Sequence, residues 1–131
     1  PTLTPTPDVD FMLVKVRKLT PCENQGNHHI YIHVVDANGR GINNVPVKIS
    51  WGTNANDSII AKTEAKDKGD GYIEFAMFKG TYNVQVLGGS SMVASGITAD
   101  FEKDEACDAT GNPVGNSLYH ASFEVVFRRT W

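Results

Sequence analysis

The sequence predicts an all-β protein, folded as an antiparallel β-sandwich of seven to eight strands. Short runs rich in β-branched and aromatic residues recur at a spacing of about ten residues, separated by clusters of Gly, Asn, Asp and Pro. Within most runs apolar and polar side chains alternate, as strands with one buried face require. No window carries an apolar stripe at the helical period with capping residues at its ends, so the pattern favours strands throughout.

The first eight residues differ in composition from the rest of the chain. Residues 1–7 read Pro-Thr-Leu-Thr-Pro-Thr-Pro, and alternating proline removes backbone donors and favours extended polyproline conformations. We therefore expect residues 1–8 to form a Pro/Thr-rich linker and residues 9–131 to form a single β-sandwich domain. Because such tracts usually separate the modules of secreted proteins, other domains of the same polypeptide are expected partners.

Eight segments follow this linker in the pattern expected of strands. They span residues 10–19, 29–36, 45–52, 58–64, 71–78, 81–87, 92–98 and 118–130. The alternation within five of them predicts the side chains that point into the core: Ile30, Ile32, Val34, Val45, Val47, Ile49, Trp51, Ile73, Phe75, Met77, Tyr82, Val84, Val86, Ala121, Phe123, Val125 and Phe127. The opposite strand faces carry polar side chains together with Tyr31 and Tyr72, and we expect these faces to contact solvent.

The stretch from residue 28 to residue 87 carries a recognisable order of motifs. A strand that ends in Asp-x-x-Gly is followed by a small loop, a Val-x-Val strand and two strands that each begin next to a glycine; these motifs lie at 29–39, 45–49, 71–75 and 80–86. Asn38-Gly39 supplies the positive φ angles of a tight turn, and Tyr82 is placed to pack under a corner.

These motifs resemble the transthyretin-like or carboxypeptidase-regulatory-like domains and the bacterial Ig-like domains of the invasin type. The resemblance implies an Ig-like or transthyretin-like β-sandwich. It also implies a role as a stalk, an adhesion module or an accessory domain of a secreted enzyme. Some domains of similar shape bind carbohydrate, so the resemblance specifies the fold better than the function.

Charge and hydropathy exclude two kinds of partner. The net charge is −3, and the 12 basic and 15 acidic side chains are mixed along the chain. A phosphate backbone requires clustered Lys and Arg, and the only tight basic groups, at 15–18 and 128–129, sit in strand-like segments. We therefore expect no nucleic-acid partner. No stretch approaches the roughly 18 apolar residues needed to cross a bilayer, so we expect no membrane span.

Two cysteines, Cys22 and Cys107, stand far apart and lack the spacing of a metal site. They are either two buried thiols or one disulfide. The even count, the polar loops around both residues and the Pro/Thr-rich N-terminus favour the disulfide, which stabilises by about 4–5 kcal/mol in a chain-entropy model. A disulfide requires an oxidising compartment, so we expect a secreted or cell-surface protein.

The residue patterns that catalysis needs are not found. Ser90-Ser91 follows two glycines but lacks the pattern of a nucleophile elbow, and Cys107 is expected to be oxidised. No pair of acids for glycoside hydrolysis can be picked out among the 15 acidic residues. A small sandwich also offers little room for a cleft, so we expect that the protein is not an enzyme.

Metal binding is considered at two places. His29 and His33 share one strand face but lie about 13 Å apart, too far to hold one metal. His28 and His29 could do so only if the strand began after them and His120 came close. Two acidic segments, 67–70 and 100–108, supply the oxygen ligands of a structural calcium site, although an acidic loop is more often only solvated. We therefore expect no metal and no other cofactor.

Aromatic rings give the most useful functional signal. Secreted sandwich modules bind sugars by stacking flat rings on pyranose faces, while polar side chains read the hydroxyl groups. We expect Tyr31 to form a shallow platform with His29, His33 and Gln85 on one sheet face. The other candidate rings are Trp51, which also fits a place in the core, and Tyr72, Phe78, Tyr119 and Trp131.

The sequence thus predicts a non-catalytic accessory module of a secreted protein that binds a polysaccharide or another glycan. The residues expected to bind are Tyr31, His29, His33, Tyr72, Gln85, Trp51 and Tyr119. The alternative is a structural spacer or an adhesion domain that contacts proteins. A binding module should expose two or more rings in one plane or groove, whereas a spacer should carry isolated surface rings and have its two ends at opposite poles.

Overall fold

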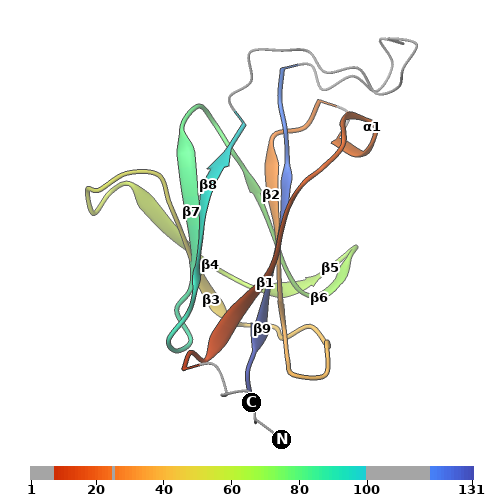
Figure 1. Ribbon diagram of the computed structural model, residues 1–131, viewed down its shortest axis with the longest axis vertical. Coiled ribbons are helices and arrows are strands. Elements are labelled where there is room, and N and C mark those ends of the chain that lie inside the picture. The colour runs from red at the N-terminus through yellow and green to blue at the C-terminus, as the bar shows by residue number, and fades with distance from the viewer. Residues whose placement is uncertain (1–7, 25, 100–118) are drawn as a thin grey trace, which may run out of the picture.

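Two β-sheets pack face to face in the computed structural model, which describes residues 8–24, 26–99 and 119–131 (Figure 1). This arrangement confirms the predicted all-β sandwich. Sheet A has the strand order β1 (Phe11–Lys18), β9 (Phe123–Arg129), β2 (His29–Val35), β6 (Gly69–Ala76) and β5 (Glu64–Lys66). Sheet B has the order β4 (Ser58–Lys62), β3 (Pro46–Ser50), β7 (Thr81–Val86) and β8 (Val93–Thr98). One helical turn, α1 (Pro21–Asn24), joins β1 to β2.

Each predicted segment coincides largely with one strand, but two short elements were not predicted. These are the turn α1 and the three-residue strand β5. The predicted strand 58–64 is in fact divided at Thr63, where the chain leaves sheet B and enters sheet A. The buried Thr63 hydroxyl replaces ladder hydrogen bonds there, because it accepts from the Val45 amide and donates to the Ile42 carbonyl.

One strand pair departs from the predicted antiparallel arrangement. The last strand, β9, lies between the first two strands of the chain, antiparallel to β1 and parallel to β2. Because β1 and β2 run in opposite directions, a strand inserted between them must be parallel to one of the two. All other strand pairs in the described residues are antiparallel.

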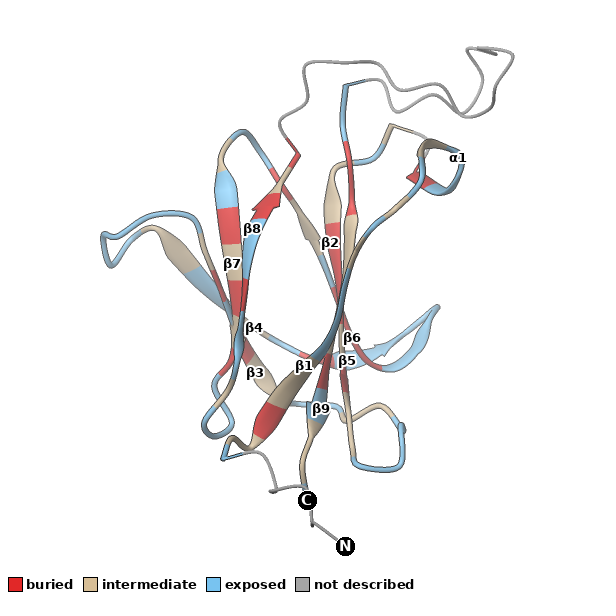
Figure 2. Ribbon diagram, viewed as in Figure 1, coloured by how far each residue is buried: buried red, intermediate tan, exposed pale blue. Residues whose placement is uncertain are grey.

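The core lies between the two sheets (Figure 2). It contains most of the side chains that alternation placed there, together with four that were not predicted: Phe11, Ala94, Ile97 and Ala99. The predicted inward residues of β2, β7 and β9 are all buried or partly buried, and Ile30, Ile32 and Val84 are completely inaccessible. Trp51 is the exception, because it follows the end of β3 and remains 37% exposed. Its ring closes one side of the core by packing against Phe75 and Tyr82.

The turn predicted at residues 36–39 forms as expected. The Asp36 carboxylate accepts hydrogen bonds from the Asn38 and Arg40 amides, which lower the pKa of Asp36, and Gly39 has a φ of 85°. The segment after this turn, residues 41–42, passes close to Gly71 of β6, which has a φ of 74°. A Cβ atom at Gly71 would lie 2.4 Å from the Val34 carbonyl oxygen, so only glycine allows this close approach.

The two ends of the described domain lie side by side. The Thr130 hydroxyl donates to the Val9 carbonyl at 2.8 Å, and the Thr130 amide donates to the Asp10 carbonyl at 2.9 Å. Residues 1–7 of the predicted linker lie outside the described residues. Among the described residues there is no helix with the length and apolar character that a membrane crossing requires.

Candidate functional site

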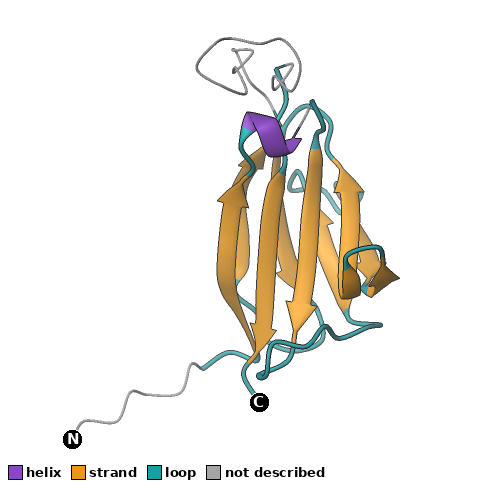
Figure 3. Cartoon of the chain, turned by 90° about the vertical axis from the view of Figure 1, so that its right-hand side faces the viewer, coloured by secondary structure: helices purple, strands orange, loops and turns teal. Residues whose placement is uncertain are grey.

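Four of the predicted binding residues gather on the outer face of sheet A, as expected from their alternation. Figure 3 shows this sheet in front, with α1 above it. The His29 and Tyr31 rings are 5.7 Å apart, the Tyr31 and Tyr72 rings stack at 6.4 Å, and His33 lies 4.9 Å from Tyr72. We call these four residues the ring strip. The predicted platform grouped Tyr31 with His29 and His33, but it did not include Tyr72, which β6 brings next to them.

The expectation that Tyr31 and Tyr72 contact solvent is wrong. Tyr31 is 8% exposed and Tyr72 only 3%. The neighbouring rings cover part of each tyrosine, and Lys68, in the turn between β5 and β6, lies over both rings. Burial raises the pKa of both phenols and lowers the pKa of the His29 and His33 imidazoles. A sugar cannot stack on these tyrosines while Lys68 is in place.

The other three predicted binding residues do not join the ring strip. Gln85 belongs to β7 in sheet B, where it pairs with Lys48 and Val93, so the expected platform of Tyr31 with Gln85 does not exist. Trp51 packs at the side of the core, as the alternative interpretation of this residue held. Tyr119 is 54% exposed and has a φ of 65°, next to His120.

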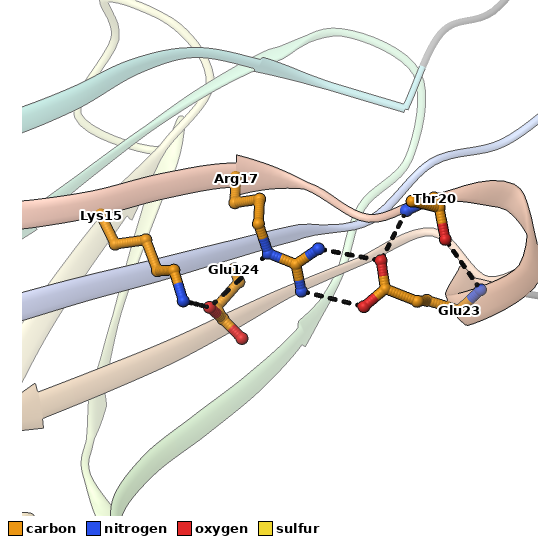
Figure 4. Close-up of polar contacts among 5 residues, drawn as sticks. All are labelled: Lys15, Arg17, Thr20, Glu23 and Glu124. Carbon is orange, nitrogen blue, oxygen red and sulfur yellow. Dashed lines mark hydrogen bonds and ion pairs between the residues drawn. The ribbon is translucent and has the colours of Figure 1, made fainter.

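Ion pairs tie β1 to β9 and to α1 at the edge of the ring strip (Figure 4). Glu124 accepts from Lys15 at 2.7 Å and lies 3.9 Å from Nε of Arg17. Arg17 also forms a bidentate ion pair with the Glu23 carboxylate. The hydrogen bond from Lys15 lowers the pKa of Glu124, and the hydrogen bond from Arg17 lowers the pKa of Glu23 to about 2. Because water still reaches these side chains, which are between 28% and 50% exposed, the pairs orient the side chains more than they stabilise the fold.

The turn α1 is specified by its own residues. The Thr20 hydroxyl accepts from the Glu23 amide, and the Glu23 carboxylate accepts from the Thr20 amide at 2.9 Å. This reciprocal pair is a capping box, and Pro21 occupies the first helical position, where its missing N–H is not needed. The local motif Thr-Pro-Cys-Glu therefore closes one turn without support from a longer helix.

This turn positions the end of the sandwich through Asn24. The Asn24 side chain is 1% exposed and donates to the carbonyls of Asn27 and His120. It thus fixes the start of the β9 segment next to the start of β2. Cys22 in α1 is not a free thiol, whereas its predicted partner Cys107 lies outside the described residues. The pairing of these two cysteines stays a prediction.

A pocket of about 330 Å³ opens at this end of the sandwich, which we call the end pocket. It is lined by residues from segments that are far apart in sequence: His28, Met77, Phe78, Lys79, Ala99 and His120. His28 and His120 lie 5.1 Å apart with their rings edge to face, and Phe78 lies 6.4 Å from His28. His28 also stacks on His29 at 5.5 Å, so the end pocket adjoins the ring strip.

Hydrogen bonds set the orientation of the two imidazoles in the end pocket. Nδ1 of His28 contacts the Met77 carbonyl, and Nδ1 of His120 contacts the Tyr119 carbonyl at 2.9 Å. A carbonyl oxygen only accepts hydrogen bonds, so Nδ1 must donate in both rings. In a neutral imidazole the other nitrogen, Nε2, is then an acceptor that a ligand hydroxyl can use.

Phe78 is the most exposed aromatic side chain in the described residues, at 74%. The amide of Phe78 donates to the Tyr82 hydroxyl at 2.9 Å, so the tyrosine predicted to pack under a corner holds the loop that carries Phe78. Sequence reasoning counted Phe78 among the candidate rings but placed it in no site, because no periodic pattern connects the loops that line the end pocket.

The condition set for a metal site is met only in part. His120 does approach His28, yet the described residues contain no group of three or more His, Cys, Asp or Glu side chains arranged to hold a metal ion. The second acidic segment considered for calcium, 100–108, lies outside the described residues. Comparisons of the chain with protein-family models, with curated proteins and with solved structures find no match.

Proposed function

We propose that this domain is a non-catalytic accessory module that binds carbohydrate, with the end pocket as its binding site. The observation that carries the proposal is the position of Phe78, whose ring is 74% exposed where it lines a pocket that also contains two imidazoles. An exposed ring beside a pocket offers a ligand apolar surface whose burial on binding is favourable. The proposal moves the site from the sheet face to the end of the sandwich.

The end pocket combines the two kinds of contact that sugar recognition needs. The Phe78 ring can stack on the apolar face of a pyranose unit. The Nε2 atoms of His28 and His120 can accept hydrogen bonds from hydroxyl groups, and Lys79 can donate to ring or hydroxyl oxygens. The volume, about 330 Å³, suits one sugar unit at the end of a chain or a short branch.

The positions of the chain ends disfavour the spacer alternative. A spacer separates its neighbours by receiving the chain at one pole and releasing it at the other. Val9 and Thr130 are hydrogen-bonded to each other, so segments before and after the domain would leave from the same pole. The residues that line the end pocket adjoin the start of β2, the end of β6 and the end of β8, and in Figure 1 these strand ends lie away from the C-terminus. This polarity suits a module that presents a ligand site, secreted or at the cell surface, on an Ig-like sandwich with a disulfide from Cys22.

The test is retention of the purified domain on insoluble polysaccharides, together with a glycan array. Phe78→Ala should weaken retention at least about tenfold, the equivalent of about 1.4 kcal/mol, while thermal stability stays within about 0.5 kcal/mol. Trp131→Ala is the matched control, because Trp131 is 61% exposed but does not line the end pocket and instead packs against Phe11. The proposal fails if the unchanged domain is retained on no glycan, or if Phe78→Ala and Trp131→Ala have equal effects.

A further inference from the structure

The stacked pair of Tyr31 and Tyr72 already holds an ammonium group of the same chain. The Lys68 Nζ atom lies 3.9 Å from the centre of the Tyr31 ring and 5.7 Å from the centre of the Tyr72 ring. Both distances are within the roughly 6 Å over which a cation is attracted to an aromatic face. The ring strip is therefore a binding surface for an alkylammonium ion, and the protein itself supplies the ion.

The surroundings of the two tyrosines favour a positive charge. Glu74 lies directly opposite Tyr31 in the β2–β6 register, and its negative charge adds to the effect of burial in raising the pKa of both phenols. Burial also lowers the pKa of His29 and His33, so these flanking imidazoles favour the neutral form. In addition, the buried Nδ1 atom of His29 has no hydrogen-bond partner among the described residues.

Lys68 belongs to the tip of the β5–β6 hairpin, which has few contacts with the rest of the domain. It lies in an exposed turn, and every residue of β5 on one side of the turn is exposed. The β5–β6 pairing has two register positions, Glu64 with Tyr72 and Lys66 with Gly69, and an irregularity between them. In Figure 1 this hairpin bends out of sheet A, away from sheet B. Exposed edge hairpins of this kind open at a lower free energy than the core.

We propose that the ring strip is a binding site for organic ammonium groups, and that Lys68 occupies it until the ammonium group of a ligand takes its place. The Tyr31 and Tyr72 rings supply the cation–π contact, and Glu74 supplies the compensating charge. A quaternary ammonium compound and the amino group of a lysine side chain share this chemistry. The site is separate from the end pocket, so it goes beyond the proposed carbohydrate binding.

The experiment titrates the folded domain with tetramethylammonium chloride, and in a second arm with n-butylammonium chloride, against sodium chloride at equal ionic strength. Binding is followed by NMR through the ring signals of Tyr31 and Tyr72. Lys68→Ala removes the internal competitor, and Lys68→Ser replaces it if the alanine variant does not fold. Lys66→Ala is the matched control, because Lys66 lies on the same hairpin but pairs with Glu64 at 3.0 Å.

Removal of the internal cation should tighten the binding of tetramethylammonium at least about fivefold relative to the unchanged domain. Lys66→Ala should bind like the unchanged domain, and adding Tyr31→Leu to Lys68→Ala should abolish the gain. A response to butylammonium alone would assign the site to primary amines such as lysine. The proposal is overturned if neither ammonium ion shifts the tyrosine signals in the Lys68 variants, or if Lys66→Ala shows the same gain. Loss of glycan retention by Phe78→Ala would not bear on this result.

Discussion

Removing the hydroxyl group of Tyr82 tests whether this residue holds the loop that carries Phe78 at the end pocket. Tyr82 is 4% exposed, and its ring packs 5.6 Å from Phe75 and 6.0 Å from Trp51. Its hydroxyl accepts the amide hydrogen of Phe78 at 2.9 Å. Tyr82→Phe leaves the ring in place and removes only this acceptor, so the loop that carries Phe78 loses its attachment to β7.

The expected loss of stability can be bounded from both sides. A net hydrogen bond contributes about 1 kcal/mol, and a donor left unsatisfied in the interior costs about 1–3 kcal/mol. Because Phe78 itself is exposed, water can reach its amide once the hydroxyl is gone, which favours the lower value of about 1 kcal/mol. Removing the whole ring with Tyr82→Ala should instead cost about 3–5 kcal/mol, since it opens a cavity in the core.

Urea denaturation measures this difference, and the slope with urea concentration should not change. Amide hydrogen exchange at Phe78 should accelerate in Tyr82→Phe, because its hydrogen bond is the one removed. Tyr119→Phe removes the same atom from a ring that is 54% exposed and should change stability by less than about 0.5 kcal/mol. Unchanged stability together with unchanged exchange at Phe78 would show that Tyr82 does not hold this loop.

Two further predictions concern the backbone and the ring strip. Gly71→Ala should lower the free energy of unfolding by at least about 3 kcal/mol, because the new Cβ atom would lie 2.4 Å from the Val34 carbonyl oxygen and the residue would keep a left-handed φ. Gly39→Ala should lower it by only about 1–2 kcal/mol, because Gly39 has a φ of 85° but no atom within 4 Å of its Cβ position. Equal costs at the two positions would contradict the close approach at Gly71. His29 and His33 should titrate below their ordinary pKa of 6.5 in NMR experiments. As the pH falls, these histidines then bind protons in the unfolded chain before they do so in the folded domain. The stability contributed by the two neutral imidazoles is therefore complete above about pH 6.5 and is lost as the pH falls through their folded-state pKa values. Titration midpoints above 6.5 would refute this prediction.

The strands and the core could be predicted from the sequence because both depend on local burial. In β2, Ile30, Ile32 and Val34 alternate with His29, Tyr31 and His33, and this alternation indicates which face points to the core, whatever lies on the other side of it. Strand neighbours are not encoded in this way. Nothing in the residues of β9 indicates that it inserts between β1 and β2, since pairing depends on contacts between residues more than 90 positions apart in sequence.

The ring strip shows the limit of the same reasoning at the surface. Alternation correctly placed Tyr31 and Tyr72 on the outer face of sheet A, but a position on an outer face does not determine exposure. The side chain of Lys68 reaches these rings only because the β5–β6 hairpin bends out of the sheet, and a three-residue strand leaves too short a pattern to detect.

A sequence motif could have predicted α1, whereas no sequence motif could have predicted the end pocket. Thr20 and Glu23 have the spacing of a capping box, with Pro21 at the first helical position, and this motif predicts a helical turn even without an apolar stripe. The residues of the end pocket come from loops at 28, 77–79, 99 and 120. Only the pairing of the strands between them brings these loops together, so no local pattern could reveal the pocket.

The register of β9 determines the geometry of both proposed sites. Alternation requires Val125 and Phe127 to face the core, and a slip of one residue would turn both side chains to the outer face. The same slip would remove Ser122 from the His29 amide, to which its buried hydroxyl is bonded at 2.9 Å. It would also shift His120 away from Asn24. The end pocket and the upper part of the ring strip are therefore consequences of how the C-terminal strand fills the core. Substitutions in β9 should therefore weaken ligand binding at both sites. Substitutions at Phe78 should affect only the end pocket, and substitutions at Lys68 only the ring strip.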